Sequence, residues 1–311
     1  MISILLPTYN GEEFIAEQIE SILSQSVKDF KLFILDDLST DNTFAIACEY
    51  ARRYPHVVFA EQNETNTGGA SSNFIQLMMR IRDDYVMLCD QDDVWLDDKI
   101  ELSLEKIVEM EQAYDSSTPI LVHTDLTVTD ENLRIISNSY KSMANIDFGF
   151  NRLNNLIAMN IPTGCTIMYN RALSELITTE PDFVVMHDWW ASLIAAAFGE
   201  IGYVDAPTVL YRQHERNSIG AKRVLSPKYI QYVLSNINVM AEKLNNSYRQ
   251  ARSFLKIYYE DLNGVQMELF SAHGSMHRRS KVGKIFTMIR YNTFLYGVAR
   301  KVGQIIVILF S

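Results

Sequence analysis

The sequence predicts an α/β protein with a mainly parallel sheet and helices on both faces. Two observations support this fold class. Short apolar runs alternate with segments of helical apolar spacing over residues 1–115. Polar and acidic motifs also follow directly after several of these runs, as they do where parallel strands end at a binding edge. Beyond Pro227 the pattern is helical.

The individual elements follow from these patterns. Apolar runs in the first half predict strands at 2–6, 32–35, 57–60 and 85–89. Apolar stripes between and after them predict helices around 15–23, 44–51, 74–81 and 100–108. The second half predicts short strands at 120–122, 165–169, 203–204 and 209–211, and a helix at 189–198.

Composition narrows the class of protein. A chain of 311 residues with 48% hydrophobic and 21% charged residues can form a packed core. The net charge of −10 argues against nucleic acid as a partner. Three dispersed cysteines, Cys48, Cys89 and Cys165, predict reduced thiols. The N-terminal run lacks the features of a secretion signal. We therefore expect a cytoplasmic protein.

The C-terminal part differs in charge from the rest. Seven basic residues and no acidic ones follow Glu268. We therefore divide the chain into a mainly α/β domain, 1–222, and a helical basic extension, 223–311, with the boundary near Gly220–Pro227.

An acidic cluster, Asp90-Gln91-Asp92-Asp93, follows the fourth predicted strand. Carboxylates this close repel one another unless a cation lies between them. Mg²⁺ and Mn²⁺ prefer oxygen ligands and share them with phosphates. The cluster therefore predicts a divalent metal site, with a solvated acidic loop as the alternative.

Four motifs, taken in order, resemble those of family 2 glycosyltransferases with the GT-A fold. They are 7–11 (PTYNG), 36–43 (DDLSTDNT), 66–70 (NTGGA) and 90–93 (DQDD). Weaker similarity to bacterial rhamnosyltransferases of polysaccharide assembly continues through 160–166, 187–190 and 211–214. The resemblance implies a nucleotide-sugar donor and a glycan or lipid-linked acceptor. It also makes 1–222 the expected catalytic domain, with the nucleotide-sugar side over about 1–115 and the acceptor side over about 116–222.

The resemblance also implies roles for single residues. Asp92 and His214 would hold Mn²⁺ or Mg²⁺. Alternatively, a protonated His214 could bind the diphosphate. Arg212 would offset the charge of the leaving diphosphate. The donor nucleotide would contact Pro7, Thr8, Tyr9, Asn10, Asp36, Asn66, Gly68, Gly69 and Asp90.

On the acceptor side, Asp188 is the candidate general base for a single inverting displacement. A helix cap is the alternative role for this residue. Gly164 and Cys165 would lie near the acceptor or sugar. Trp189 and Trp190 could stack on a sugar ring, with one of the two expected in the core.

Several choices stay open at this stage. L-rhamnose from dTDP-rhamnose is the expected donor, with a UDP-hexose or galactofuranose donor as the alternative. An aspartate-nucleophile phosphatase and a non-catalytic nucleotide-binding assembly subunit are the rival functions. The basic tail predicts peripheral binding to the inner membrane surface, or packing against the protein or a second copy of the chain.

Overall fold

The computed structural model describes residues 1–214 and 226–311, and the chain divides into two compact units. Unit 1 comprises 1–140, 162–180 and 198–221, and unit 2 comprises 141–161, 181–197 and 222–311. The boundary predicted near Gly220–Pro227 falls largely on residues outside the described ones. Unit 2 thus also takes in two earlier segments that the sequence analysis placed on the acceptor side.

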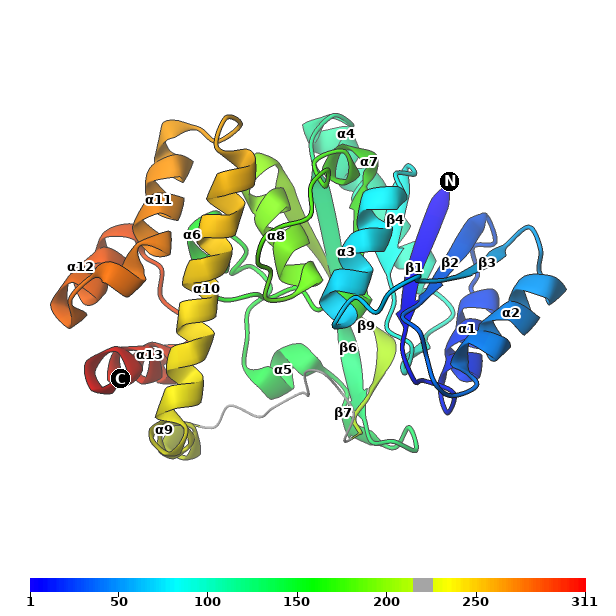
Figure 1. The fold of residues 1–311 in the computed structure, drawn as a ribbon, viewed down its shortest axis with the longest axis horizontal. Coiled ribbons are helices and arrows are strands. Elements are labelled where there is room, and N and C mark those ends of the chain that lie inside the picture. The colour runs from blue at the N-terminus through cyan, green and yellow to red at the C-terminus, as the bar shows by residue number, and fades with distance from the viewer. Residues whose placement is uncertain (215–225) are drawn as a thin grey trace. The chain divides into compact units, whose positions relative to one another are not determined.

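Unit 1 is built on one nine-stranded sheet with the order β3-β2-β1-β4-β8-β6-β9-β5, and β7 pairs with β6 (Figure 1). Its strands are β1 (Ile2–Thr8), β2 (Phe30–Asp36), β3 (Val58–Gln62), β4 (Tyr85–Leu88), β5 (Val94–Trp95), β6 (Ile120–Thr129), β7 (Ile135–Ser137), β8 (Ile167–Asn170) and β9 (Glu200–Arg212). Its helices are α1 (Ile15–Leu23), α2 (Thr43–Arg53), α3 (Ala70–Arg80), α4 (Lys99–Tyr114) and α7 (Arg171–Ser174), with a 3₁₀ turn at Gly164–Thr166.

The β3-β2-β1-β4 half of the sheet is parallel, whereas β8 runs antiparallel to both of its neighbours. All seven residues of β1 are buried, as expected for a central strand covered on both faces. The predicted α/β fold is therefore confirmed, and each of the eight helices and strands predicted in the first half has a counterpart within a few residues.

The second half differs from the prediction most clearly in its last strands. The two short strands expected at 203–204 and 209–211 form one strand, β9, paired in parallel with β6. The register of this pairing shifts around Asp125, which lies opposite Pro207. Proline has no N–H to donate to the ladder, so the strand accommodates it at an irregularity instead of ending there.

Unit 2 is helical. Its elements are α5 (Tyr140–Ala144), α6 (Leu153–Leu156), α8 (His187–Phe198), α9 (Ser226–Ser235), α10 (Ile237–Tyr258), α11 (Gly264–Gly274), α12 (Lys281–Tyr291) and α13 (Val298–Phe310), with a 3₁₀ turn at Met276–Arg278. Phe254 of α10 stacks on Phe270 of α11, with 4.4 Å between ring centroids. A second cluster, which joins α10, α12 and α13, consists of Tyr248, Met276, Met288 and Ile308.

Candidate functional site

The loops that follow β1 and β4 are joined at the carboxyl edge of the sheet. The backbone N–H of Tyr9 donates to Oε1 of Gln91 at 2.9 Å, and Nε2 of Gln91 donates back to the Tyr9 carbonyl at 3.0 Å. Gly11 makes this approach possible, because a Cβ at this position would lie 2.5 Å from the Gln91 side chain. Tyr9 itself is 50% exposed, so its ring is open to a ligand.

Asp36, at the end of β2, is fully buried and accepts four hydrogen bonds. Its donors are the hydroxyl of Thr8, the backbone and hydroxyl of Ser39, and the side-chain amide of Gln62. Both carboxylate oxygens are thus already occupied within the protein. In this conformation Asp36 ties the β1 and β2 loops together, and a bond to a nucleotide would have to be added to this set or replace part of it.

Asp37 organises the glycine-containing loop, a role that the sequence analysis missed. Its carboxylate accepts from the backbone and the hydroxyl of Thr67, both at 2.8 Å, and from Asn63 at 2.8 Å. Asn66 donates to the Asp37 carbonyl. Gly68 follows with φ of +84° and open space where a side chain would be, so the backbone here is accessible to a ligand.

The two predicted metal ligands, Asp92 and His214, lie together. Oδ2 of Asp92 is 2.8 Å from Nε2 of His214, although 122 residues separate them in the chain. The imidazole also stacks on the ring of Phe14, with centroids 4.9 Å apart. The stacking holds the imidazole beside Asp92, so that an oxygen and a nitrogen that a cation could share lie within hydrogen-bond distance of each other.

A second group of potential ligands comprises Asp90, Asp93 and Cys165, whose ligand atoms lie within 4.8 Å of one another. Asp93 and Cys165 are fully buried, and Oδ2 of Asp93 has no hydrogen-bond partner among the described residues. Burial raises the pKa of Asp93 well above its ordinary value, and Asp92 and Asp90 add to the increase. Burial likewise raises the pKa of the Cys165 thiol.

These two groups differ in how well they suit Mn²⁺ or Mg²⁺. Cys165 offers a soft sulfur ligand, whereas Mn²⁺ and Mg²⁺ prefer oxygen. Asp92 and His214, with the partly exposed Asp90 in the same loop, offer a better donor set. Cys165 and Gly164 are both buried, so neither presents surface to an acceptor.

Lys99 lies beneath the acidic loop and is fully buried. Its Nζ is 4.7 Å from the centroid of the Trp95 ring and has no hydrogen-bond partner in the described parts of the chain. Burial lowers its pKa to about 8, although Cys165, Cys89 and Asp93 act in the opposite direction. A buried cation close to several carboxylates lowers the free-energy cost of placing them together. The sequence analysis did not identify Lys99.

Arg212, at the end of β9, is bound within the protein. Its guanidinium donates to the carbonyls of Asp92 at 2.9 Å and Glu131 at 2.6 Å, and to the carboxylate of Glu17. Its backbone N–H donates to Oδ1 of Asp93 at 3.1 Å. The arginine predicted to contact the diphosphate therefore braces the acidic loop in this conformation.

Three of the residues predicted for the acceptor side, Asp188, Trp189 and Trp190, belong to unit 2. Asp188 lies in the first turn of α8, partly exposed, and its Oδ1 accepts from the N–H of Trp189 at 2.6 Å. Its neighbour His187 is buried, which lowers the pKa of that imidazole to about 3. The His187 imidazole is therefore neutral at neutral pH, and Asp188 is the acidic residue of the first turn of α8.

The two tryptophans of α8 have different surroundings. Trp190 is fully buried, 5.3 Å from Phe254 between ring centroids, so it is the core residue of the pair. Nε1 of Trp189 donates to the Leu156 carbonyl at 2.5 Å, and Trp189 is only partly buried. Of the two rings, only that of Trp189 retains surface for a sugar.

In unit 1, groups that could bind a nucleotide and a cation lie at one edge of the sheet. An oxygen and a nitrogen donor, an exposed tyrosine ring and an accessible glycine backbone all follow strands at one edge of the sheet. The family model described as Glycosyl transferase family 2 matches residues 3–178, which contain most of these loops. This chain belongs to glycosyl transferase family 2.

Relatives and solved structures agree with this family. The chain is 31% identical over 228 residues to the dTDP-rhamnosyl transferase RfbG of Shigella flexneri, a match that covers 72% of this chain and 76% of that protein. Residues 1–349 of S. aureus TarS, in complex with UDP-GlcNAc, share the fold with a TM-score of 0.54 and 17% identity, over 99% of this chain and 90% of that one.

The mannosyltransferase PcManGT of Pyrobaculum calidifontis, in complex with GDP-Man and Mn²⁺, has a TM-score of 0.52 at 15% identity and covers 99% of this chain and 84% of that one. The predicted GT-A fold of this family 2 enzyme is therefore confirmed. Family membership also decides between sugar transfer and the phosphatase alternative, in favour of sugar transfer.

Proposed function

We propose that this family 2 glycosyltransferase moves L-rhamnose from dTDP-rhamnose to a hydroxyl of a glycan or lipid-linked glycan in cell-surface polysaccharide synthesis. The proximity of Asp92 to His214, in the loop after β4 that is hydrogen-bonded to the β1 loop, supports the transfer chemistry. The choice of rhamnose rests on the identity of 31% to a dTDP-rhamnosyl transferase. A UDP-hexose or galactofuranose donor is the alternative.

Oδ2 of Asp92 and Nε2 of His214 would hold the divalent cation. Their mixed oxygen and nitrogen set favours Mn²⁺ over Mg²⁺, because Mg²⁺ strongly prefers oxygen. When bound, such a cation stabilises the negative charge that builds on a departing nucleoside diphosphate. The exposed Tyr9 ring and the backbone at Gly68 would contact the donor nucleotide.

Asp188 is the proposed general base for the acceptor hydroxyl. Its position in the first turn of α8 favours the ionised form, since the positive end of the helix stabilises a carboxylate. An ionised carboxylate can accept the hydroxyl proton as the oxygen attacks the anomeric carbon. We propose a single displacement with inversion.

Peripheral binding to an anionic membrane is the proposed role of the C-terminal helices. Val282, Phe286 and Ile289 form an apolar stripe on α12 at helical spacing, and they are 77%, 63% and 63% exposed. Lys281 and Arg290 flank this stripe. Among the described residues, the helices are too short or too polar for any of them to cross a bilayer. Association of this face with a second copy of the chain is the alternative.

A panel of nucleotide sugars, assayed for nucleoside diphosphate release with and without Mn²⁺, tests the proposal. Asp92→Asn should lower turnover by at least about 100-fold, whereas Asp188→Asn should retain donor binding and lose transfer. Asp98→Asn, which removes an exposed carboxylate next to α4, is the matched control and should transfer normally. Near-normal transfer by Asp92→Asn would refute the metal role, and donor binding without turnover by the wild type would favour the assembly-subunit alternative.

A further inference from the structure

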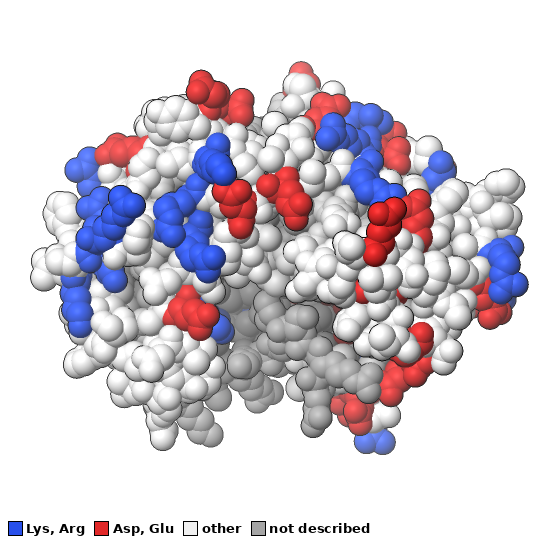
Figure 2. All heavy atoms as spheres, viewed as in Figure 1, with Lys and Arg blue, Asp and Glu red and all other residues white. Residues whose placement is uncertain are grey.

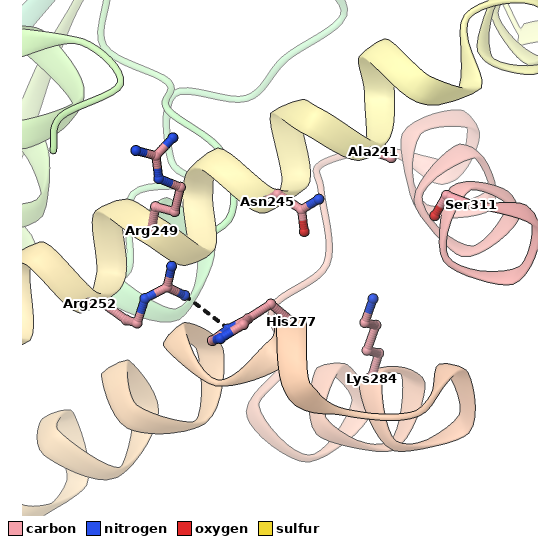
Figure 3. A pocket seen from close by; sticks show the side chains of 7 residues that line it. All are labelled: Ala241, Asn245, Arg249, Arg252, His277, Lys284 and Ser311. Atoms are coloured by element: carbon pink, nitrogen blue, oxygen red, sulfur yellow. Dashed lines mark hydrogen bonds between the residues drawn. The ribbon is translucent and has the colours of Figure 1, made fainter.

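Arginine guanidinium groups lie over phenylalanine rings in both units. In unit 2, the guanidinium carbon of Arg249 is 3.9 Å from the centroid of Phe183. This arginine borders an open depression between α10 and α12 (Figure 3), on a surface where Lys and Arg gather (Figure 2). In unit 1, the guanidinium carbon of Arg212 is 4.8 Å from the centroid of Phe14, and the same ring also contacts His214. Phe14 therefore lies next to a proposed metal ligand.

Phe14 is held at the start of α1. Its backbone N–H donates to the Gly11 carbonyl at 3.0 Å, and its own carbonyl accepts from the N–H of Gln18 at 3.1 Å. Glu17, three positions further along, accepts a hydrogen bond from the guanidinium of Arg212. The start of α1 therefore contacts the end of β9 through two side chains, the ring of Phe14 and the carboxylate of Glu17.

His214 lies two positions beyond the end of β9. The pairing of β9 with β6 ends at Arg212, opposite Thr129, and the N–H of Gln213 donates to the Thr129 carbonyl at 3.0 Å. The imidazole then lies against Phe14, with 4.9 Å between ring centroids and 22° between ring planes. Because the strand pairing has ended before His214, contacts of its side chain help to set the direction of the imidazole.

The hydrogen bond between His214 and Asp92 cannot hold the imidazole in a metal-loaded site. It joins Nε2 to Oδ2 at 2.8 Å, and both side chains are largely shielded from water, with exposed fractions of 10% and 16%. Ligation of a cation requires the lone pair of Nε2, so this hydrogen bond would be lost. The stacking on Phe14 uses the face of the imidazole and does not involve Nε2, so it is compatible with ligation.

We propose that Phe14 is a positioning residue that holds the imidazole of His214 for a divalent cation and thereby sets the preference of the site for Mn²⁺ over Mg²⁺. This inference rests on the proposed metal role of Asp92 and His214. A ring that is already held in place loses little conformational freedom when its nitrogen becomes a ligand, so the nitrogen contributes more to the affinity. Mg²⁺ strongly prefers oxygen, so a well-placed imidazole nitrogen favours Mn²⁺.

Titration with Mn²⁺, with the free ion measured by electron paramagnetic resonance, tests the proposal, and competition by Mg²⁺ gives the affinity for the second ion. Phe14→Leu removes the aromatic face and should bind Mn²⁺ about three- to tenfold more weakly, the range expected for the loss of an aromatic pair. Its affinity for Mg²⁺ should change less, whereas a loss of folded structure would lower both affinities. Phe14→Met, which also lacks the ring, should give the same result. Phe14→Tyr keeps the ring and should bind both ions as the wild type does.

Phe59→Leu is the matched control. Phe59 of β3 stacks on Phe33, with 5.3 Å between ring centroids, and Nζ of Lys31 lies 5.7 Å from the Phe59 centroid. Phe59 therefore has an aromatic and a cationic neighbour, as Phe14 has, but it belongs to the strand at one end of the sheet order. Its replacement should leave both metal affinities unchanged.

The nitrogen coupling in the electron spin echo spectrum of bound Mn²⁺ separates the role of Phe14 from the metal role of His214. The coupling should be present in the wild type, absent in His214→Gln and weaker in Phe14→Leu. Absence of the coupling in the wild type would refute the metal role of His214, and the role of Phe14 with it. If the wild type shows the coupling and folded Phe14→Leu has wild-type affinities for both ions, Phe14 does not position His214, whereas the metal role of His214 stands.

Discussion

Replacing Arg212 tests whether this residue braces the acidic loop or binds the diphosphate. Its side chain is 5% exposed, and Arg212→Met would leave the carbonyls of Asp92 and Glu131 without their donors. An acceptor shielded from water costs about 1–3 kcal/mol when it loses its donor. The Asp92 carbonyl is partly buried, whereas Glu131 is exposed, so water can replace the donor there. The bond to Glu17 adds little to this sum, because the Glu17 side chain is 52% exposed and water can replace the guanidinium.

We therefore expect Arg212→Met to lower the free energy of unfolding by about 1–3 kcal/mol. For a unit of this size, that corresponds to a fall in the melting temperature of about 2–12 °C. Urea denaturation, followed by tryptophan fluorescence, measures the change. Arg171→Met is the matched control, since Arg171 pairs with Asp84 at the surface and its side chain is 51% exposed. The control should lose less than about 1 kcal/mol.

The same variant distinguishes the two roles by a second measurement. If Arg212 acted only on the diphosphate, Arg212→Met would unfold at the wild-type urea concentration and bind nucleoside diphosphate at least about tenfold more weakly. That combination would refute the bracing role. Arg212→Lys should remain less stable than the wild type, because an ammonium group cannot make the three divergent contacts of the fork.

Two further predictions concern buried ionisable groups. Burial lowers the pKa of Lys99 to about 8 in the folded protein, against about 10.4 in the unfolded chain. The unfolded chain therefore binds more protons between these values, and stability should rise as the pH increases from about 8 to about 10. Lys99→Met removes this titration, and a variant whose urea midpoint still rose over this range as the wild type's does would contradict the prediction. Burial lowers the pKa of both His187 and His273 to about 3, below the value of about 6.5 in the unfolded chain. Each histidine should therefore lower the stability of unit 2 by about 1.4 kcal/mol per pH unit as the pH falls from about 6.5 towards 3. His273→Gln should halve the contribution of these two histidines to the slope of stability against pH, measured by urea titrations at several pH values, and an unchanged slope would show that His273 titrates normally.

The sequence by itself determined the α/β architecture and the loops that form the donor edge. Apolar periodicity is a local property, so β1, β2, β4 and the helices between them could be predicted from short windows. The placement of motifs after strands was equally predictable, because parallel strands end at the same edge of a sheet. These two regularities were enough to place Tyr9, Asp36 and Asp92 together.

Only the tertiary structure decided which side chains meet. The pairing of β5 with β9 sets Val94 opposite Leu210, and this register brings Arg212 and His214 to the acidic loop. Glu17 meets Arg212 from 195 positions away in the chain. No local pattern encodes such a contact, because it depends on the register of a sheet assembled from distant segments. Burial likewise distinguished Trp190, a core residue, from Trp189, although the two are adjacent in the sequence.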